Sequence, residues 1–222
     1  MEKYVVNVIR TDFVTYNVKR FVIEKPAGYN FIPGQATDVA INKTGLEEEL
    51  RPFTFTSLND WKHLEFTIKI YKGHNGITEQ LLDLLPGDQL IIHEVFGAIN
   101  YQGPGLFIAG GAGITPFIAI LRQLQQDGKL AGNKLLFANH TDDDIILKDE
   151  LKAMLGDHHI DIIAHPDDVN IKGSHIDMAL LKQHITGEAQ YYYICGPDQF
   201  TEAMVQNLVD LGIERSRIIL EQ

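Results

Sequence analysis

The stretch LFIAGGAGITPF, residues 106–117, decides the fold of the second half of the chain. Four apolar residues typical of a buried strand run into a Gly-Gly-x-Gly turn, and Thr115-Pro116 then predicts the start of a helix. Glycines let backbone N–H groups approach a ligand closely, and the positive end of the helix dipole favours a diphosphate there. The spacing Gly-x-Gly-x-x-Pro departs from the Gly-x-Gly-x-x-Gly of dinucleotide-binding sheets, so a purely structural turn is an equal alternative.

Downstream of this stretch, strand-like runs alternate with amphipathic helical patterns. The strand-like runs are continuously apolar, as expected of strands covered on both faces, and most helical patterns end near a glycine. This alternation predicts a doubly wound α/β fold with a parallel sheet and right-handed crossovers. The expected strands are 134–140, 161–165, 191–196 and 217–221, and the expected helices are 115–128, 145–156, 174–187 and 197–212.

Upstream, the sequence consists of short runs rich in β-branched and aromatic residues, separated by Gly, Pro, Asn or Asp. Such spacing predicts an antiparallel β-barrel or sandwich. One helical pattern interrupts it, in which Thr78 can act as the cap, Leu81, Leu82 and Leu85 share a face, and Pro86-Gly87 ends the helix. The expected strands are 3–10, 18–25, 36–41, 51–57, 63–71 and 88–96.

The pattern changes at Gly103-Pro104-Gly105, which is typical punctuation for a domain boundary. We therefore expect two domains, an antiparallel β-barrel over residues 1–103 and an α/β domain over residues 104–222.

Composition limits the class of protein. The chain has 222 residues and a formal net charge of −11. This excess of acid disfavours binding to nucleic acid or to an anionic membrane surface, which requires clustered Lys and Arg. A single cysteine excludes an internal disulfide and a cysteine-ligated iron–sulfur cluster formed by this chain alone. The adjacent His158 and His159 have poor geometry for a shared metal, so we expect them to be solvated and expect no metal site.

Two further features bear on location. The first ten residues, MEKYVVNVIR, lack the basic and apolar regions of a signal peptide. The most apolar stretch, residues 105–121, is too short and too interrupted by glycine, threonine and proline for a membrane span. We therefore expect a soluble, cytoplasmic protein.

A second candidate site follows the strand-like run 191–195, at Cys195-Gly196-Pro197. In an open parallel sheet, ligands bind at the carboxyl ends of the strands, and both this turn and the glycine turn lie at that edge. The alternative for Cys195 is an ordinary buried core thiol.

Two more candidates lie in the first half. In RPFTFTS, residues 51–57, Arg51 can clamp a phosphate, and the aromatic residues flank a hydroxyl that points the other way. An ordinary barrel strand is the favoured alternative when this segment is taken alone. In HNGITEQL, residues 74–81, Gly76 and Thr78 precede a helix and could seat an anion, although simple helix capping is clearly the favoured explanation when this segment is taken alone.

Taken together and in this order, these segments resemble the ferredoxin–NADP reductase superfamily of flavoenzymes over nearly the whole chain. FIPGQ (31–35) is similar to its barrel motif, RPFTFTS to its Arg-x-Tyr-Ser/Thr flavin motif, GGAGITP (110–116) to its nucleotide motif, and CGP (195–197) to its Cys-Gly-Pro. The resemblance implies a flavin-binding barrel followed by a nicotinamide nucleotide-binding parallel sheet, without an iron–sulfur domain.

The resemblance also implies roles for individual residues of the flavin motif. Arg51 would contact a flavin phosphate. Phe53, which follows Pro52, would pack on the isoalloxazine ring or the ribityl chain. Thr54 would hydrogen-bond the ring nitrogen that receives hydride, which makes it one of two residues expected closest to the chemistry.

Further flavin contacts are implied downstream of that motif. Lys69 and Tyr71 could reach the flavin's phosphates or its adenosine. Gly76, Ile77 and Thr78 would hold the diphosphate through backbone N–H groups and the Thr78 hydroxyl.

For the nicotinamide nucleotide, the resemblance implies that Gly111, Gly113 and Thr115 bind the diphosphate and ribose. Cys195 would border the nicotinamide, as the second residue expected at the chemistry, together with Gly196 and Pro197.

The sequence departs from the family pattern at three places. Phe53 replaces the usual Tyr, which keeps a stacking surface and loses a phenolic hydrogen bond. Asn75 stands where many members have Gly, so FAD is expected, with FMN as the less favoured alternative. No aromatic residue follows Ile219, so we expect the flavin face to be open or covered by a partner, and Glu221 matches the family's terminal acidic residue only loosely.

The choice between NADH and NADPH depends on charge after the expected strands. A 2′-phosphate needs Arg or Lys nearby. The segments NHTDDDI (139–145) and HPDDVN (165–170) are acidic and contain neither. Capping of a helix start, where acidic residues are favoured, is the preferred explanation of the Asp142–Asp144 run itself, but the run would still repel an additional phosphate. NADH is therefore favoured over NADPH, and His140 and His165 keep NADPH open.

Three functions remain open at this level. The first is an NAD(P)H-dependent flavin reductase that passes electrons to flavodoxin, ferredoxin or a small acceptor. The second is a non-catalytic flavin- or nucleotide-binding regulatory subunit. The third is an electron-transfer subunit of a larger complex, against which the single cysteine argues.

Overall fold

The computed structural model describes residues 2–73, 76–97, 99–163, 176–187 and 190–221. The expectations that concern Asn75 and the segment 165–170, with His165, lie outside these ranges. The chain divides into two compact units, Met1–Ala98 and Ile99–Gln222, which are described separately below. No helix in the described ranges is long and apolar enough to cross a membrane.

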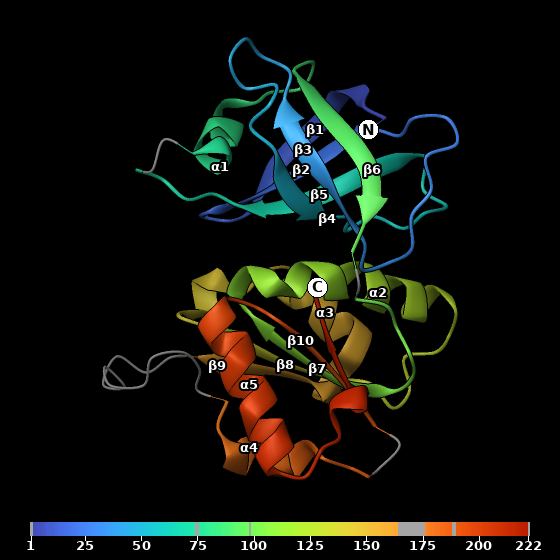
Figure 1. Ribbon diagram of the computed structural model, residues 1–222, viewed down its shortest axis with the longest axis vertical. Coiled ribbons are helices and arrows are strands. Elements are labelled where there is room, and N and C mark those ends of the chain that lie inside the picture. The colour runs from blue at the N-terminus through green and yellow to red at the C-terminus, as the bar shows by residue number, and fades with distance from the viewer. Residues whose placement is uncertain (1, 74–75, 98, 164–175, 188–189, 222) are drawn as a thin grey trace. The chain divides into compact units, whose positions relative to one another are not determined.

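The first unit is a six-stranded antiparallel sheet with the strand order β4-β3-β6-β1-β2-β5 (Figure 1). An isolated bridge between Phe55 and Phe66 joins its two outer strands, so the sheet curls into a barrel. The predicted antiparallel barrel is thus confirmed. Its strands are β1 (Tyr4–Thr15), β2 (Val18–Glu24), β3 (Ala36–Ile41), β4 (Arg51–Thr54), β5 (His63–Lys69) and β6 (Gln89–Phe96).

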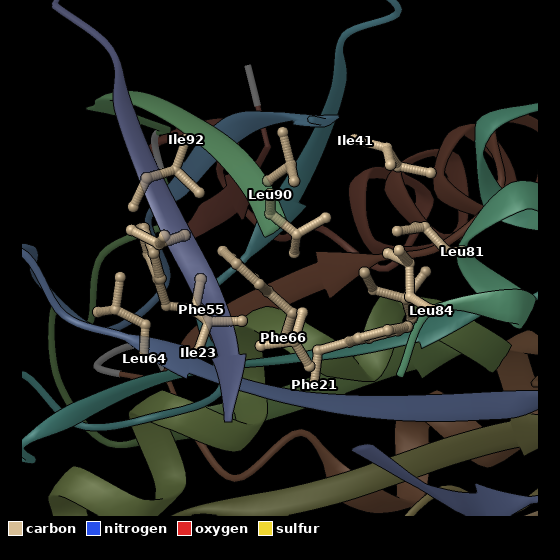
Figure 2. Packing of buried hydrophobic residues seen from close by; sticks show 14 of the residues in the cluster. Phe21, Ile23, Ile41, Phe55, Leu64, Phe66, Leu81, Leu84, Leu90 and Ile92 are labelled. Carbon is tan, nitrogen blue, oxygen red and sulfur yellow. The ribbon is translucent and has the colours of Figure 1, made fainter. Parts of the chain in front are cut away.

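The barrel core consists of the side chains at alternate positions along the strands, which point inward. Phe21 and Ile23 of β2 lie beside their register partners Phe66 and Leu64 of the neighbouring strand β5 (Figure 2). Phe55 packs on Phe66, with ring centroids 5.2 Å apart. These side chains are fully or almost fully buried. Removing so much aromatic and β-branched surface from water is the main stabilising term for the unit.

The predicted helix after β5 is shorter than expected. It consists of α1 (Ile77–Gln80) followed by a 3₁₀ turn, and Gly76 rather than Thr78 occupies its N-cap position. The backbone leaves the helical conformation and becomes extended at Leu84. As a result the side chain of Leu84 enters the core, and Leu85 is 64% exposed. The expectation that Leu85 shares a face with Leu81, which is fully buried, is therefore wrong.

The second unit is a parallel sheet with the order β11-β10-β7-β8-β9, flanked by helices on both faces (Figure 1). The predicted doubly wound α/β fold is confirmed. The strands are β7 (Gly105–Gly110), β8 (Lys134–Asn139), β9 (His159–Ile163), β10 (Tyr191–Cys195) and β11 (Ile218–Leu220), and the helices are α2 (Thr115–Gln126), α3 (Lys148–Leu155), α4 (Met178–His184) and α5 (Asp198–Asp210).

Two helix starts differ from the prediction. Ile145 and Ile146 stay outside α3, because Leu147 takes a left-handed conformation with φ 52° and interrupts the chain before Lys148. α4 begins only after Asp177, whose side chain accepts a hydrogen bond from the Leu180 backbone N–H. A local cap therefore decided the start of α4, as it does for many helices.

Candidate functional site

The connections of the parallel sheet reverse direction between β7 and β10. From β7 the chain proceeds outward to β8 and β9, whereas β10 and β11 lie on the other side of β7. Ligands of such sheets bind outside the carboxyl ends of the strands at this reversal. The glycine turn after β7 and the Cys-Gly-Pro turn after β10 occupy those two strand ends.

The two turns touch through glycine backbone. A Cβ atom on Gly113 would lie 2.2 Å from the Cys195 carbonyl oxygen and 2.6 Å from the Gly196 nitrogen. A Cβ on Gly196 would lie 2.7 Å from Cδ1 of Phe200. These separations are too short for any side chain, so glycine is required where the turns meet.

Gly111 has a different role. Its φ is +52°, which favours glycine, and a Cβ there would have no atom within 4 Å. The backbone of this turn therefore faces open space, directly before the twelve-residue α2. A half-buried turn with open space in front of Gly111, at the positive end of a helix, can receive a diphosphate.

Thr115 does not cap α2 as the sequence pattern predicted. Residues Gly111–Ile114 form a 3₁₀ turn, and Ile114 occupies the cap position without a side-chain bond. The Thr115 hydroxyl instead donates to the Ala112 carbonyl oxygen at 3.1 Å. This bond stiffens the glycine turn and leaves the hydroxyl oxygen's lone pairs available as acceptors.

Cys195 is 8% exposed, and its thiol donates to Oε2 of Glu221 at 3.6 Å. Burial raises the pKa of the Cys195 thiol well above its ordinary value, and the nearby Glu221 carboxylate raises it further. The thiol therefore stays protonated near neutral pH and cannot act as a nucleophile. Glu221, which the sequence pattern matched only loosely, is brought to Cys195 by the pairing of β11 with β10.

The first unit presents its candidate residues around β4. Arg51 and Pro52 are exposed, and Thr54 is half-buried on the outward side of the strand. Phe53 is also half-buried, but it packs against the barrel core, with its ring centroid 6.4 Å from that of Phe66. The alternation of aromatic and hydroxyl side chains that the sequence predicted follows from the pleat of the strand.

A second group lies beyond the end of β5. Lys69 Nζ is 5.9 Å from the ring centroid of Tyr71, and Tyr71 is 52% exposed. Ile77 is buried and anchors α1, whereas Gly76 has open space where a Cβ would stand and Thr78 is half-buried. Cations, an exposed aromatic ring and a free backbone turn are what a phosphorylated aromatic cofactor requires.

Comparison with known proteins gives the family of the second unit and the fold of the whole chain. Residues 107–206 match the family described as the oxidoreductase NAD-binding domain. The chain is 29% identical over 217 residues to NADH–cytochrome b5 reductase 1 of Arabidopsis thaliana, covering 90% of this chain and 76% of that protein. Its fold matches the crystal structure of a ferredoxin NADP+ reductase from Neisseria gonorrhoeae with bound FAD and NADP, at a TM-score of 0.80, 19% identity and coverage of 99% and 98%. Residues 107–206 therefore belong to the oxidoreductase NAD-binding domain family, and the chain as a whole has the fold of a ferredoxin NADP+ reductase.

It is an NAD(P)H-dependent flavoprotein reductase, as the resemblance of the motifs implied. A further relative is the reductase component of propane 2-monooxygenase of Rhodococcus jostii (strain RHA1), 27% identical over 221 residues. The match covers 89% of this reductase and 57% of that protein.

The FIPGQ motif of the reductase has a positioning role that sequence reasoning did not assign. Oε1 of Gln35 accepts the Ile32 N–H at 2.7 Å, and the Gln35 carbonyl oxygen accepts the Phe55 N–H at 3.1 Å. Phe31 stacks on Phe55 with ring centroids 4.3 Å apart. The motif therefore holds the chain just after Thr54. The FIPGQ motif was visible in the sequence, but the sequence did not show that the motif contacts Phe55.

The acidic segment after β8 is also internally paired. Thr141 and Asp144 form a reciprocal capping box, and Lys148 Nζ contacts the Asp142 carboxylate. Asp143 is exposed. Capping therefore explains why an aspartate stands at position 144, which is the explanation preferred from the sequence. Lys148, which follows the acidic segment, partly neutralises its negative charge.

His159 is not solvated as expected. Its side chain is 1% exposed, and its Nε2 lies 2.9 Å from Oδ1 of Asp161. Burial lowers the pKa of His159, against the opposing effect of Asp161. Among the described residues, no three His, Cys, Asp or Glu side chains converge as metal ligands.

Proposed function

We propose that this reductase takes hydride from NADH onto FAD held by the barrel unit and passes the electrons to a small redox protein such as flavodoxin or ferredoxin. Bound FAD supplies the two-electron chemistry, and the chain supplies binding, orientation and electrostatics. The observation that carries the proposal is the meeting of the glycine turn with the Cys-Gly-Pro turn at the reversal point of the sheet.

On the flavin side, we assign phosphate binding to Arg51 and to the backbone at Gly76–Thr78. The exposed guanidinium of Arg51 can form two parallel hydrogen bonds to a phosphate. Thr54 presents its hydroxyl on the outward side of β4, beside Pro52, and is our first choice for the hydrogen bond to the flavin ring. Phe53 packs against the barrel core behind this strand. This position favours a role in supporting β4 over a role as a stacking surface for the flavin.

Lys69 and Tyr71 are assigned to the outer part of the flavin nucleotide. Tyr71 offers an exposed ring face for adenine, and Lys69 lies beside that ring with a cation for a phosphate. FAD, unlike FMN, contains the adenine that would use this ring, so the pair supports FAD.

On the nicotinamide side, we assign the diphosphate to the turn at Gly111 and Gly113, with Thr115 as an acceptor of ribose hydroxyls. Cys195, Gly196 and Pro197 border the nicotinamide. Because its thiol stays neutral, Cys195 adds no charge near a ring that loses hydride and becomes positive. Its role is therefore to position the ring, which matters because hydride transfer needs short, aligned contact between the two rings.

The preference for NADH rests on the segment after β8. A 2′-phosphate there would meet the exposed Asp143, and Lys148 is already engaged with Asp142.

The electron acceptor is a further proposal. The relatives named above include a cytochrome b5 reductase and a monooxygenase reductase component, which supports a small redox protein as the acceptor and leaves cytochrome b5 beside flavodoxin and ferredoxin.

The test is anaerobic mixing of the purified, FAD-loaded protein with NADH and, separately, with NADPH, while the visible flavin absorbance is followed. We expect rapid bleaching by NADH and slower bleaching by NADPH. Thr54→Val keeps the shape of the side chain and removes its hydroxyl, so it should slow bleaching by about tenfold, whereas Thr54→Ser should not. Failure to bind FAD, or no bleaching by either nucleotide, would contradict the proposal.

A further inference from the structure

A groove of about 590 Å³ lies on the first unit, at the place where β1 and β2 separate. It is lined by residues 3–6 and Ile9, by residues 24–26 after β2, and by Lys62. In the strand order β4-β3-β6-β1-β2-β5, two strands separate β1 from β4 in either direction. The groove, termed here the β1 edge groove, therefore lies across the barrel from the candidate flavin strand.

One side of the β1 edge groove is an unpaired strand edge. β1 pairs with β6 from Tyr4 onward, but it pairs with β2 only from Val8 onward. The Val8 N–H donates toward β6, to the Asp88 carbonyl oxygen at 2.8 Å. Because backbone groups alternate sides along an antiparallel strand, the N–H and C=O of Val5 point into the groove. The Asn7 N–H confirms this alternation, since it donates away from β6, to Oε2 of Glu24 at 3.0 Å.

The side chains around this edge are apolar and basic. Val5 and Ile9 are each 52% exposed, which is unusual for aliphatic residues on a barrel strand. Lys3 and Lys62 are exposed at the rim, and Lys25 is held there by Asn59. Three lysines thus face the groove of a chain whose net charge is −11.

The acidic groups nearby are partly engaged. Glu24, which lines the groove, accepts both the N–H and the side-chain amide of Asn7, and these bonds lower its pKa. The negative charge of Asp60 opposes the lowering of the pKa of Lys25 by burial. Glu2 and Glu94 raise the pKa of Tyr4 at the margin of the groove. The lysines also discourage unwanted strand pairing, because charged edges resist self-association. An acidic segment of another protein would be attracted to the lysines at this edge, whereas a basic or neutral segment would not.

We propose that the β1 edge groove binds an extended, acidic segment of a partner protein, which adds to β1 as a further strand. Main-chain hydrogen bonds to Val5 provide affinity, alternate apolar side chains of the segment cover Val5 and Ile9, and its carboxylates pair with Lys3 and Lys62. Since the groove lies across the barrel from β4, such a segment tethers a partner while the candidate flavin strand stays free. This inference does not depend on the proposed acceptor or on the choice of nucleotide.

The experiment uses the whole 222-residue chain, loaded with FAD, and a fluorescein-labelled octapeptide of alternating glutamate and valine. Binding is followed by fluorescence anisotropy at low salt and in added salt. We expect saturable binding that weakens with salt, and no binding of the matched peptide of alternating lysine and valine. Hydrogen exchange at the Val5 amide should slow when the acidic peptide is bound, because that N–H becomes a strand donor.

Two variants separate strand addition from simple charge attraction. Val5→Pro removes the N–H that points into the groove and leaves the ladder to β6 intact, so it should weaken binding by about tenfold or more. Lys3→Glu combined with Lys62→Glu should weaken it to a similar degree. Lys129→Glu combined with Lys152→Glu makes the same change of charge at two exposed residues of the other unit and should have no effect. The visible flavin spectrum and the melting temperature establish that each variant is folded.

Several results would overturn the inference. Peptide binding that is equal in the Val5→Pro variant and the parent protein would mean that charge alone attracts the peptide. Absence of binding, or equal binding of the lysine peptide, would mean that the lysines only protect the strand edge. Binding to vesicles containing phosphatidylserine without binding to the peptide would identify a membrane contact in place of a strand partner.

Discussion

Substitution of Gly113 tests the contact on which the nucleotide half-site depends. In Gly113→Ala, the new Cβ would lie 2.2 Å from the Cys195 carbonyl oxygen and 2.4 Å from the Cys195 carbonyl carbon. Both are backbone atoms, so no side chain can rotate away to relieve the collision. One of the two turns has to move by about 1 Å to restore van der Waals contact.

The cost follows from this geometry. Overpacking a well-packed site usually destabilises by about 1–3 kcal/mol, and a collision with backbone belongs at the upper end of that range or above it. A loss of 3 kcal/mol lowers the melting temperature of a chain of this size by about 6–12 °C. Because the turns also carry the proposed diphosphate and nicotinamide contacts, NADH affinity should fall, while FAD binding by the barrel unit should persist.

Gly111→Ala is the matched control. Its Cβ would meet nothing within 4 Å, but the residue has a φ of +52°. The expected cost is therefore only the strain of a left-handed alanine, about 1 kcal/mol. Urea unfolding followed by circular dichroism measures both costs, and hydrogen exchange of β7 and β10 locates the damage. The reasoning is refuted if Gly113→Ala is as stable as the parent protein, or less destabilising than Gly111→Ala.

Three further predictions use the same unit. Tyr193→Phe should cost about 1–3 kcal/mol in urea unfolding, because the Gly103 carbonyl oxygen loses the Tyr193 hydroxyl as donor and two backbone N–H groups lose their acceptor; no loss would show that water replaces the hydroxyl. Cys195 should react with iodoacetamide at least tenfold more slowly in the folded protein than in urea, since burial raises the pKa of its thiol; equal rates would contradict that. His159, whose pKa is lowered in the folded state, should contribute stability above pH 6.5 that is lost as the pH falls below it, because the unfolded chain then binds the additional proton. His159→Asn should flatten this part of the stability profile, and an unchanged slope would assign it to other groups.

Local pattern was sufficient where a structure repeats along the chain. The alternation of residues such as Phe21 and Ile23 with outward-facing neighbours predicted a barrel strand, and the continuous apolar run before Gly110 predicted a strand covered on both faces. Both patterns depend on side chains two to four positions apart, which is the range over which the backbone dictates direction. Errors arose at element ends such as Thr115, where a single side-chain bond decides between two local conformations.

The sequence by itself determined the two fold classes, the order of the motifs and therefore the resemblance to the ferredoxin–NADP reductase superfamily. Only the tertiary structure decided that Gly113 abuts Cys195, that Glu221 reaches the same thiol, and that the edge of β1 beside Val5 is unpaired. The physical reason is that secondary structure follows from interactions between near neighbours, whereas contacts between distant segments depend on strand register and on the packing of the whole unit.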